Sequence, residues 1–395
     1  MSNSSAAAAD ACGDLPNLLS SFVDTFVDYS VSGIFLPPPP QNPNNPQPLQ
    51  THYPASSNRL IAIGDVHGDL PKTKESLRLA NLIDASDRWI GKDTTLVQIG
   101  DVLDRGGDEL KILYFLEKLK REASRSGGEV ITMNGNHEIM NVEGDFRYVT
   151  PSGLNEFIDW ARWFTVGNEI KSLCKGLEKP RDIFKGIPFR FKGVKEEFFH
   201  GIRARIAALR PNGPIASRFL SPNVTVLVVG DSVFVHGGLL AQHVLYGLER
   251  INEEVRDWIN GLKGRVSPPY LRGRNSVVWL RKFSDKEKNC DCSLLEHVLE
   301  TIPGAKRMIM GHTIQEVGIN GVCENKAIRI DVGMSKGCIN GLPEVLEINK
   351  NSELRVLTSN RLYQKRDKSF LEANQKDGAG FLVMKHGPTP VEVKS

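Results

Sequence analysis

The stretch Gly64-Asp65-Val66-His67-Gly68, which follows the apolar run at residues 60–63, decides the fold of this chain. Because Asp65 and His67 are two residues apart, their side chains point the same way in extended backbone, and a metal ion can sit between them. The apolar run is typical of a buried β-strand, and the glycines let the backbone turn tightly where the strand ends. The stretch therefore predicts a metal-binding loop at the end of a strand.

Four further blocks of the same kind follow in order, each after an apolar run rich in β-forming residues. They are Gly100-Asp101-Val102-Leu103-Asp104-Arg105-Gly106 after residues 95–99, Gly135-Asn136-His137-Glu138 after 130–133, His236-Gly237-Gly238 after 224–229 and 233–235, and Gly311-His312 after 307–310. Polar side chains from distant parts of the chain would meet at one edge of a sheet, in an α/β domain. One such block alone would suit a simple turn, but five in order argue against coincidence.

The residue types in these blocks suit a pair of divalent metal ions. Two ions about 3.5–4 Å apart need a bridging carboxylate, with neutral nitrogen and oxygen donors around them. His137 directly follows Asn136, so it would lie near the ions without having to bind them, where a proton donor to a leaving oxygen belongs. Arg105 would place a planar, permanently charged fork on phosphate oxygens. The blocks therefore predict a two-metal phosphoester hydrolase.

The five blocks resemble the signature of the PPP-type metallophosphatases, which reads GDxHG, GDxxDRG, GNHE, HGG and GH. Longer stretches at residues 203–209, 247–261, 276–283 and 328–337 resemble the Shewanella-like protein phosphatases of plants, and most closely their second, non-plastid type. The resemblance covers residues 15–360. It implies a metallophosphoesterase sandwich, in which two mixed β-sheets flanked by helices hold a dimetal site at one edge.

The resemblance also assigns roles to individual residues. Asp65 and His67 match ligands of the first metal, Asp101 matches the bridging carboxylate, and Asn136, His236 and His312 match ligands of the second metal. His137 matches the residue that protonates the leaving group, and Asp104 matches the residue that orients it. Arg105 matches one phosphate-binding arginine, and Arg281 matches the second by local pattern, with Arg274 as the alternative.

The implied cofactors are two divalent ions, with manganese expected and iron or zinc as alternatives. The implied reaction is direct attack on phosphorus by a hydroxide held between the ions, without a covalent phosphoenzyme. The implied partners are phosphorylated proteins, with a preference for phosphotyrosine, and no regulatory subunit is specified. The alternatives are a phosphatase directed at Ser and Thr, or a dinucleoside-polyphosphate hydrolase.

A different phosphatase chemistry also has a candidate in the sequence. Cys323 and Arg329 have the bare C-x5-R spacing of cysteine-dependent phosphatases. The glycines that open a phosphate loop are absent, and residues 324–326 are instead typical of a hairpin turn that leads into a strand at 327–330. We therefore expect the spacing to be coincidental.

Composition narrows the possible partners. The formal net charge is +3 over 395 residues, which implies no strong electrostatic field for nucleic acid or a membrane surface. A membrane-spanning helix needs about 20 apolar residues, and the apolar runs here have the length of short strands. The segment before Arg59 contains acidic residues but no Lys or Arg, whereas transit peptides are rich in arginine. These features predict a cytosolic protein, with the mitochondrial intermembrane space as the alternative.

The chain divides into three parts. Residues 1–58 would hold an amphipathic helix and a Pro-rich connector, residues 59–360 the catalytic domain, and residues 361–395 a polar tail. The apolar face of the helix would pack on the catalytic domain, and it consists of Leu15, Leu18, Leu19, Phe22, Val23, Phe26 and Val27. An insert at about 141–223 would form a cap whose basic residues, Arg203, Arg205 and Arg210 among them, form either a solvated face or a wall for acidic peptides.

The chain has six cysteines, too few for a disulfide scaffold in a chain of this length. Two pairs stand out, Cys290 with Cys292 and Cys323 with Cys338. We expect reduced structural thiols, because cytosolic thiols stay reduced. Oxidation of these pairs would fit the intermembrane space.

Overall fold

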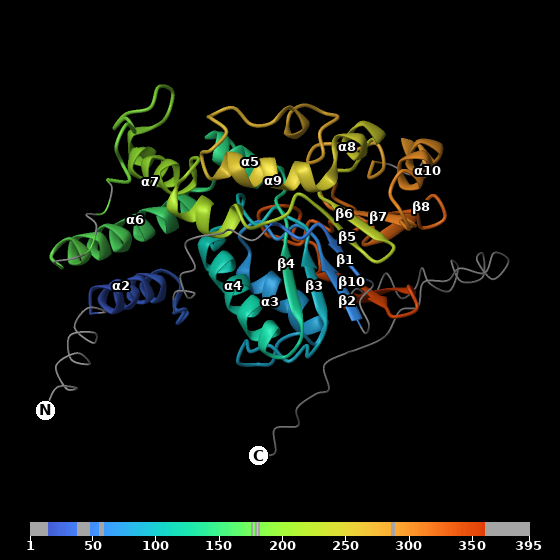
Figure 1. Cartoon of the computed structure of the whole chain (residues 1–395), viewed down its shortest axis with the longest axis horizontal. Helices are drawn as coiled ribbons and strands as arrows, with labels where there is room; N and C mark the ends of the chain where they lie inside the picture. Colours follow the sequence, from blue (N-terminus) through green and yellow to red (C-terminus); the bar gives the residue numbers. More distant parts are fainter. Residues whose placement is uncertain are drawn as a thin grey trace, which may run out of the picture.

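The computed structural model describes residues 15–37, 48–54, 59–174, 177, 180, 182–285 and 289–359. Two mixed β-sheets pack face to face, with helices on their outer sides (Figure 1). This architecture confirms the predicted α/β sandwich. Most of the predicted connector and the whole predicted tail, at residues 38–47 and 361–395, lie outside the described part of the chain.

The first sheet has five strands in the order β11-β10-β2-β3-β4. Their bounds are β2 Arg59–Ile63, β3 Thr95–Gln98, β4 Glu129–Thr132, β10 Glu344–Asn349 and β11 Leu354–Thr358. The strands β2, β3 and β4 run parallel, with β4 at the edge, and β10 pairs antiparallel with both β2 and β11. Parallel strands covered on both faces are apolar along their whole length, as the runs in the sequence predicted.

The second sheet has six strands in the order β1-β5-β6-β7-β9-β8. Their bounds are β1 His52–Tyr53, β5 Val226–Val229, β6 Ser232–Val235, β7 Arg307–Met310, β8 Asn320–Val322 and β9 Ala327–Arg329. A bridge between Met133 and Val224 joins the two sheets where β4 ends and β5 begins. This junction brings the loops after β4 and β6 to the same side of the sandwich.

Helices cover the sheets and build a separate lobe (Figure 1). Their bounds are α2 Leu15–Ser32, α3 Leu70–Leu79, α4 Glu109–Arg125, α5 Asn136–Glu143, α6 Pro151–Ser172, α7 Phe199–Leu209, α8 Ala241–Tyr246, α9 Leu248–Ile259 and α10 Cys292–Glu300. Helices α3 and α4 lie against the first sheet, and α9 packs on β5 of the second. Helices α6 and α7 pack on each other within the predicted cap. In the described residues, no helix is long and apolar enough to cross a membrane.

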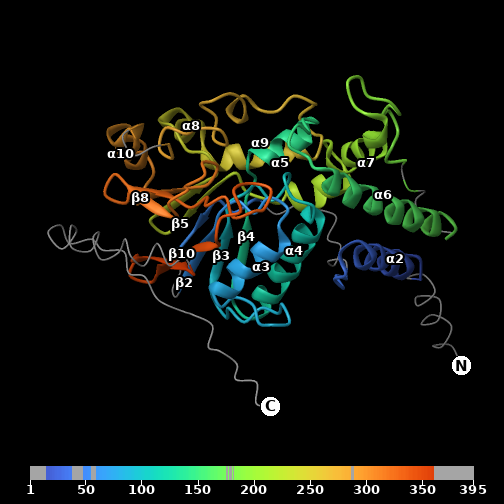
Figure 2. The same ribbon diagram turned by 180° about the vertical axis from the view of Figure 1, so that it is seen from behind.

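The N-terminal helix α2 forms as predicted and packs on α6 and α4, as Figure 2 shows from behind. Its buried face is only partly the predicted one. Val23 and Val27 are buried, but Leu18 and Phe22 are 71% and 69% exposed. The prediction of a single buried apolar face was therefore wrong, because α2 holds more apolar residues than the neighbouring helices cover.

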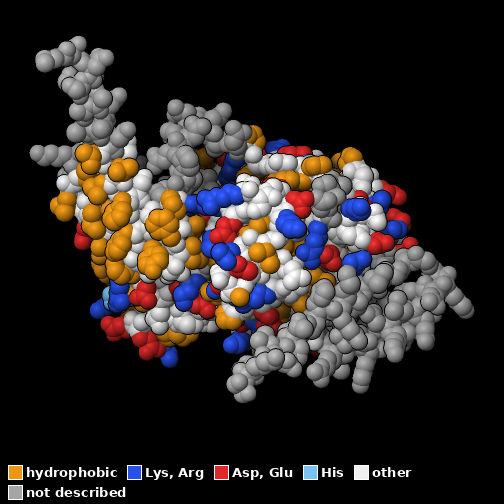
Figure 3. Space-filling model, turned by 90° about the horizontal axis from the view of Figure 1, so that it is seen from below, with side chains coloured by type: hydrophobic (Ala, Val, Ile, Leu, Met, Phe, Trp, Pro, Cys, Tyr) orange, Lys and Arg blue, Asp and Glu red, His pale blue; other side chains and the backbone are white. Residues whose placement is uncertain are grey.

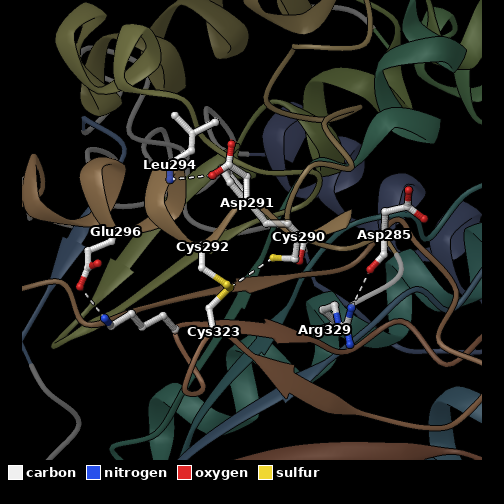
Figure 4. The surroundings of a disulfide bond; sticks show 10 residues. Asp285, Cys290, Asp291, Cys292, Leu294, Glu296, Cys323 and Arg329 are labelled. Atoms are coloured by element: carbon white, nitrogen blue, oxygen red, sulfur yellow. Dashed lines mark hydrogen bonds and ion pairs between the residues drawn. A yellow bond between two sulfur atoms is a disulfide. The ribbon is translucent and has the colours of Figure 1, made fainter. Parts of the chain in front are cut away.

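The cysteine prediction was also wrong. Cys292 and Cys323 form a disulfide, and the sulphur of Cys290 lies 3.4 Å from that of Cys323 (Figure 4). Neither pair suggested by the sequence is the bonded one, because only the fold brings the start of α10 beside the β8–β9 turn. Cys323 opens that turn, as the predicted hairpin requires, and in a disulfide it is no thiolate nucleophile.

Candidate active site

The first two candidate ligands lie in the loop after β2. Asp65 is 2% exposed and accepts hydrogen bonds from the backbone N–H of His312 at 3.2 and 3.3 Å. The Nδ1 atom of His67 lies 2.9 Å from the carbonyl oxygen of Leu103, which turns Nε2 toward Asp101 at 3.7 Å. A loop that follows a buried strand thus presents one carboxylate and one imidazole to the interior of the site.

Asp101 occupies the centre of the cluster. Its Oδ2 lies 3.2 Å from Nε2 of His236, 3.7 Å from that of His67 and 3.8 Å from that of His137. Its Oδ1 accepts the backbone N–H of His137 at 2.9 Å, which fixes the carboxylate in place. One carboxylate oxygen therefore faces histidines from three of the sequence blocks, a central position that suits a bridging ligand.

The other three candidate ligands come from the remaining blocks. Asn136 begins α5, and its Oδ1 lies 2.9 Å from Nε2 of His236. The ring of His312 packs 5.2 Å from that of His236, and its buried Nε2 has no hydrogen-bond partner in the described part of the chain. The ligand atoms of Asp101, His236 and His312 all lie within 4.8 Å of one another. An unpartnered buried nitrogen aimed at a carboxylate suits a metal ligand.

Buried charge gives a second reason to expect cations here. Burial, followed by the carboxylates of Asp331 and Asp101, raises the pKa of Asp65 well above its usual range. Burial lowers the pKa of His67 to about 4, and it also lowers that of His312, so these imidazoles are neutral. Neutral imidazoles and crowded carboxylates form a donor set that divalent ions would stabilise, because buried like charges repel one another without them.

His137 and Asp104 form the pair that the resemblance implied. Nδ1 of His137 lies 2.6 Å from Oδ2 of Asp104, and both side chains are buried. Burial alone would lower the pKa of His137, but the carboxylates of Asp101 and Asp104 raise it above its usual value. His137 therefore keeps its proton near neutral pH, as a general acid must.

Strained backbone occurs in the site, as it does at nine other non-glycine residues of the described chain. Five non-glycine residues of the site have positive φ angles: His67 at 42°, Asp101 at 56°, Asp104 at 69°, Arg105 at 65° and His312 at 65°. This conformation is uncommon for residues with a side chain, and its clustering at one place is typical of a functional site.

Comparison with known proteins agrees with this geometry. The profile of the calcineurin-like phosphoesterases matches residues 58–316. The chain is 65% identical over 386 residues to Shewanella-like protein phosphatase 2 of Arabidopsis thaliana, with 97% of both chains covered. This chain is a Shewanella-like protein phosphatase.

More distant relatives extend the comparison. The chain is 32% identical to Shewanella-like protein phosphatase 1 of Plasmodium berghei, over 71% of this chain and 68% of the relative. Its fold is similar to that of a cold-active protein-tyrosine phosphatase from a Shewanella species, with a TM-score of 0.54 and 20% identity over 79% of this chain and 83% of that one. The chain is therefore a metal-dependent phosphoesterase of the calcineurin-like family.

In this phosphatase, Arg205 of the cap supports the acid pair. It was expected on a basic surface, but its side chain is 0% exposed. Its Nη2 donates to Oδ1 of Asp104 at 2.9 Å, its Nε donates to Asn141 at 2.7 Å, and its Nη1 and Nη2 donate to Glu109 at 3.0 and 2.6 Å. The surface prediction was wrong because charge density along the sequence does not reveal a buried acidic partner.

Three carboxylates of the phosphatase site were not singled out from the sequence. Glu138 accepts the backbone N–H groups of Asp101, Val102, Leu103 and Gly135, and thereby shapes the loop that carries Asp101. Glu109 accepts the backbone N–H of Asp104 and the fork of Arg205. Asp331 lies behind Asp65, and burial raises its pKa to about 6. Glu138 had a signal in the sequence, since it closes the third block.

The predicted phosphate-binding arginines of the phosphatase make different contacts from one another. Arg105 lies over the ring of Tyr148 at 4.9 Å, and its buried Nε has no hydrogen-bond partner in the residues described. Arg281 donates to the carbonyl oxygen of His312 at 2.9 Å and to Thr313 at 2.8 Å. Arg274 and Arg281 line one cavity of about 710 Å³. Arg105 thus has an unused donor, and the choice between Arg281 and Arg274 stays a prediction.

Proposed function

We propose that this phosphatase removes phosphate from tyrosine residues of proteins. The observation that carries the proposal is a pair of aromatic rings beside the candidate catalytic groups. The ring of Tyr148 lies 5.1 Å from that of His137, and the ring of Trp279 lies 5.4 Å from that of His312. Aromatic rings attract one another by stacking and edge contacts worth about 0.5–1.5 kcal/mol, so these two would favour the aryl group of phosphotyrosine over an alkyl side chain.

In the proposed site, two divalent ions would be held by Asp65, His67, Asp101, Asn136, His236 and His312. When bound, such ions polarise the phosphoryl group and make water available as a nucleophile. Arg105 would bind the equatorial phosphate oxygens through its unused donor, with Arg281 or Arg274 as a second cation. His137 would donate its proton to the leaving oxygen, and Asp104 would hold the imidazole in the productive orientation.

Manganese is the proposed metal, with iron or zinc as alternatives. Carboxylate and amide oxygens suit Mn²⁺, and imidazole nitrogens suit zinc and iron as well, so a mixed set admits all three. Metal analysis of the purified phosphatase should find two ions per chain, and the protein after chelation should regain activity best with Mn²⁺. Recovery with zinc alone would contradict the assignment.

The substrate proposal is tested with three peptides that share all flanking residues and differ only in phosphotyrosine, phosphoserine or phosphothreonine. We expect kcat/KM to be at least about tenfold higher for phosphotyrosine, a difference of about 1.4 kcal/mol. Tyr148→Ala and Trp279→Ala should reduce that ratio, because they remove the rings that would contact the aryl group. Trp163→Ala, an exposed aromatic on α6, is the matched control. Equal rates on all three peptides would contradict the proposal.

A dinucleoside-polyphosphate hydrolase would use the same metal site. Its substrate carries two adenine rings, and hydrolysis breaks a phosphoanhydride instead of a phosphomonoester. Turnover of diadenosine tetraphosphate at a rate above that of the phosphotyrosine peptide would favour this alternative. Comparable metal dependence in both assays would show that the two activities share one site.

For the compartment, we propose the mitochondrial intermembrane space over the cytosol. The proposal rests on the Cys292–Cys323 disulfide, because disulfides persist in oxidising compartments and are rare in the cytosol. Cell fractionation with protease protection tests it. Recovery of the phosphatase in the cytosolic fraction, with Cys292 and Cys323 reduced, would contradict it.

A further inference from the structure

The helix α2 is fixed on the body of the protein by its polar residues. Asp28 is buried, and it accepts hydrogen bonds from Arg218 at 2.7 Å and from Tyr114 at 3.0 Å. Asp24 pairs with Lys171 of α6 at 2.6 Å. These contacts, together with the burial of Val23 and Val27, hold α2 in one orientation and determine which side chains it turns outward.

The contact between α2 and α6 is close and antiparallel. A Cβ atom built on Gly167 of α6 would lie 2.6 Å from Val27 and 3.2 Å from Val23, so glycine is needed there. The ring of Phe26 meets that of Trp163 edge-on at 5.5 Å. The two helices therefore form a rigid platform.

The outward face of α2 is apolar along its whole length. Leu15, Leu18, Phe22, Phe26 and Tyr29 are 57%, 71%, 69%, 39% and 56% exposed. Hydrophobic side chains gather on this end of the molecule in Figure 3. Helix α6 continues the surface with Trp163, Val166 and Ile170, each exposed by 37–40%. We call these eight residues the α2/α6 face.

The size of the α2/α6 face sets it apart from ordinary surface. An aromatic side chain can bury roughly 150–250 Å², so eight large side chains about half exposed offer on the order of 700–800 Å². A single patch on a monomer rarely exceeds a few hundred Å², and a standard interface buries about 800 Å² on each partner. The face is thus large enough for a stable protein contact.

The spacing of the exposed residues on α2 is symmetric. Leu15 and Tyr29 each lie seven residues from Phe22, and Leu18 and Phe26 each lie four residues from it. Two copies of α2 packed antiparallel about an axis through Phe22 would therefore place Leu18 opposite Phe26 of the other copy. A two-fold interface must be self-complementary in this way.

The lack of charge on the outward side of α2 also favours a second copy of this chain as the partner. The other exposed residues of α2, Asn17 and Ser21, are polar and uncharged. The helix contains neither Lys nor Arg. Its two acidic residues are already paired, Asp24 with Lys171 and buried Asp28 with Arg218. Two α2 helices can thus approach at the axis without like-charge repulsion, and the exposed Arg162 and Asp159 of α6 pair with each other. A helix that lies on an anionic membrane normally carries cations on its polar face, and α2 has none.

We propose that the α2/α6 face is a homodimer interface, in which the α2 helices of two copies pack antiparallel about a two-fold axis at Phe22. The four helices α2 and α6 of both copies then form a small bundle that covers the apolar surface.

The test measures the mass of the full chain by sedimentation over a range of concentrations. The parent protein should be a dimer at micromolar concentration. Phe22→Glu should raise the dimer dissociation constant by about a hundredfold or more, because truncating or charging the centre of an interface has the largest effect. Its phosphatase activity should stay unchanged, and its thermal midpoint should match that of the parent at concentrations where both are monomers, because dimerisation itself raises the midpoint by mass action. Leu245→Glu, at an isolated side chain of α8 that is 85% exposed, is the matched control and should remain dimeric.

Cross-linking tests the symmetry directly. Phe22→Cys should form a covalent dimer on oxidation, since the residue lies on the axis. Leu18→Cys should not cross-link to itself, because two copies would lie about 12 Å apart along the helices, beyond the reach of a disulfide. A mixture of Leu18→Cys and Phe26→Cys should cross-link between copies.

Four outcomes would overturn the proposal. The first is a parent protein that stays monomeric at the highest soluble concentration. The second is a dimer that Phe22→Glu does not weaken, which would place the interface elsewhere. The third is cross-linking of Leu18→Cys with itself, which would indicate parallel packing. Binding of the monomer to neutral vesicles, lost in Phe22→Glu, would identify a lipid surface as the occupant instead.

Discussion

Replacing Arg205 by Met should impair protonation of the leaving group while leaving substrate binding nearly intact. Arg205 contacts neither His137 nor the candidate metal ligands in the described structure. It acts through Asp104, whose Oδ1 it holds at 2.9 Å while Oδ2 lies 2.6 Å from His137. Methionine keeps the length and apolar bulk of the side chain and removes the charged fork. Oδ1 of Asp104 would then be held by Asn141 alone.

The structure sets the size of both expected effects. Removing one partner from a fully buried ion pair costs about 3–5 kcal/mol of stability, because the carboxylates of Asp104 and Glu109 stay buried without their cation. General acid catalysis contributes about 10²–10⁴ in rate, and partial loss of orientation should remove about 10- to 100-fold of it. KM should change by less than about threefold, because Arg205 is fully buried away from solvent.

The assay compares two leaving groups at a temperature where the variant is folded. We expect kcat to fall by that factor on a phosphoserine peptide and by less than about threefold on p-nitrophenyl phosphate, whose leaving group needs little protonation. Arg205→Lys restores the charge and should recover part of the loss. Arg218→Met removes the cationic partner of buried Asp28, so it should destabilise the fold without changing the ratio of the two rates. Equal losses on both substrates would refute the positioning role.

Three further predictions concern metal binding, the pH dependence of stability and the role of Cys323. Asp101→Asn should abolish turnover and lower bound metal by atomic absorption, because a neutral bridge cannot hold two dications; full metal content with normal turnover would contradict this. Burial lowers the pKa of His243 from 6.5 to about 4. Between those two pH values the unfolded chain binds a proton at His243 and the folded protein does not, so the free energy of unfolding should fall by about 3 kcal/mol as the pH drops from 6.5 to 4. Urea denaturation of His243→Gln should lack that slope. Cys323→Ser should keep its activity, and a chelator should remove it, since the mechanism needs metal and no thiolate.

Much of the site could be predicted because its residues are local in sequence. Asp65 and His67 share one loop, and each remaining candidate ligand follows its own apolar strand. The strands β2, β3, β4, β6 and β7 were all recognisable from their apolar runs, since strands buried on both faces leave a continuous signal. The short strands β1 and β8 gave no such signal, because two or three residues carry no periodicity.

The interactions that cross the fold could not be predicted. Arg205 reaches Asp104 across 101 positions of sequence, and nothing near it distinguishes it from the exposed cations of the cap. The Cys292–Cys323 disulfide joins α10 to a hairpin 31 positions away, and neighbouring cysteines gave equally plausible pairs. In both cases the partner is set by packing and not by spacing.

The sequence by itself determined the phosphoesterase class of this phosphatase, since the order and composition of five short blocks indicate which donors could bind a metal and where each strand must end. Only the tertiary structure decided what surrounds that chemistry: which arginine is buried behind the acid pair, which sulphurs are joined, and which face of α2 is left open to solvent. The physical reason is that a metal ligand is defined by its own atoms, whereas burial is defined by what distant segments bring to it.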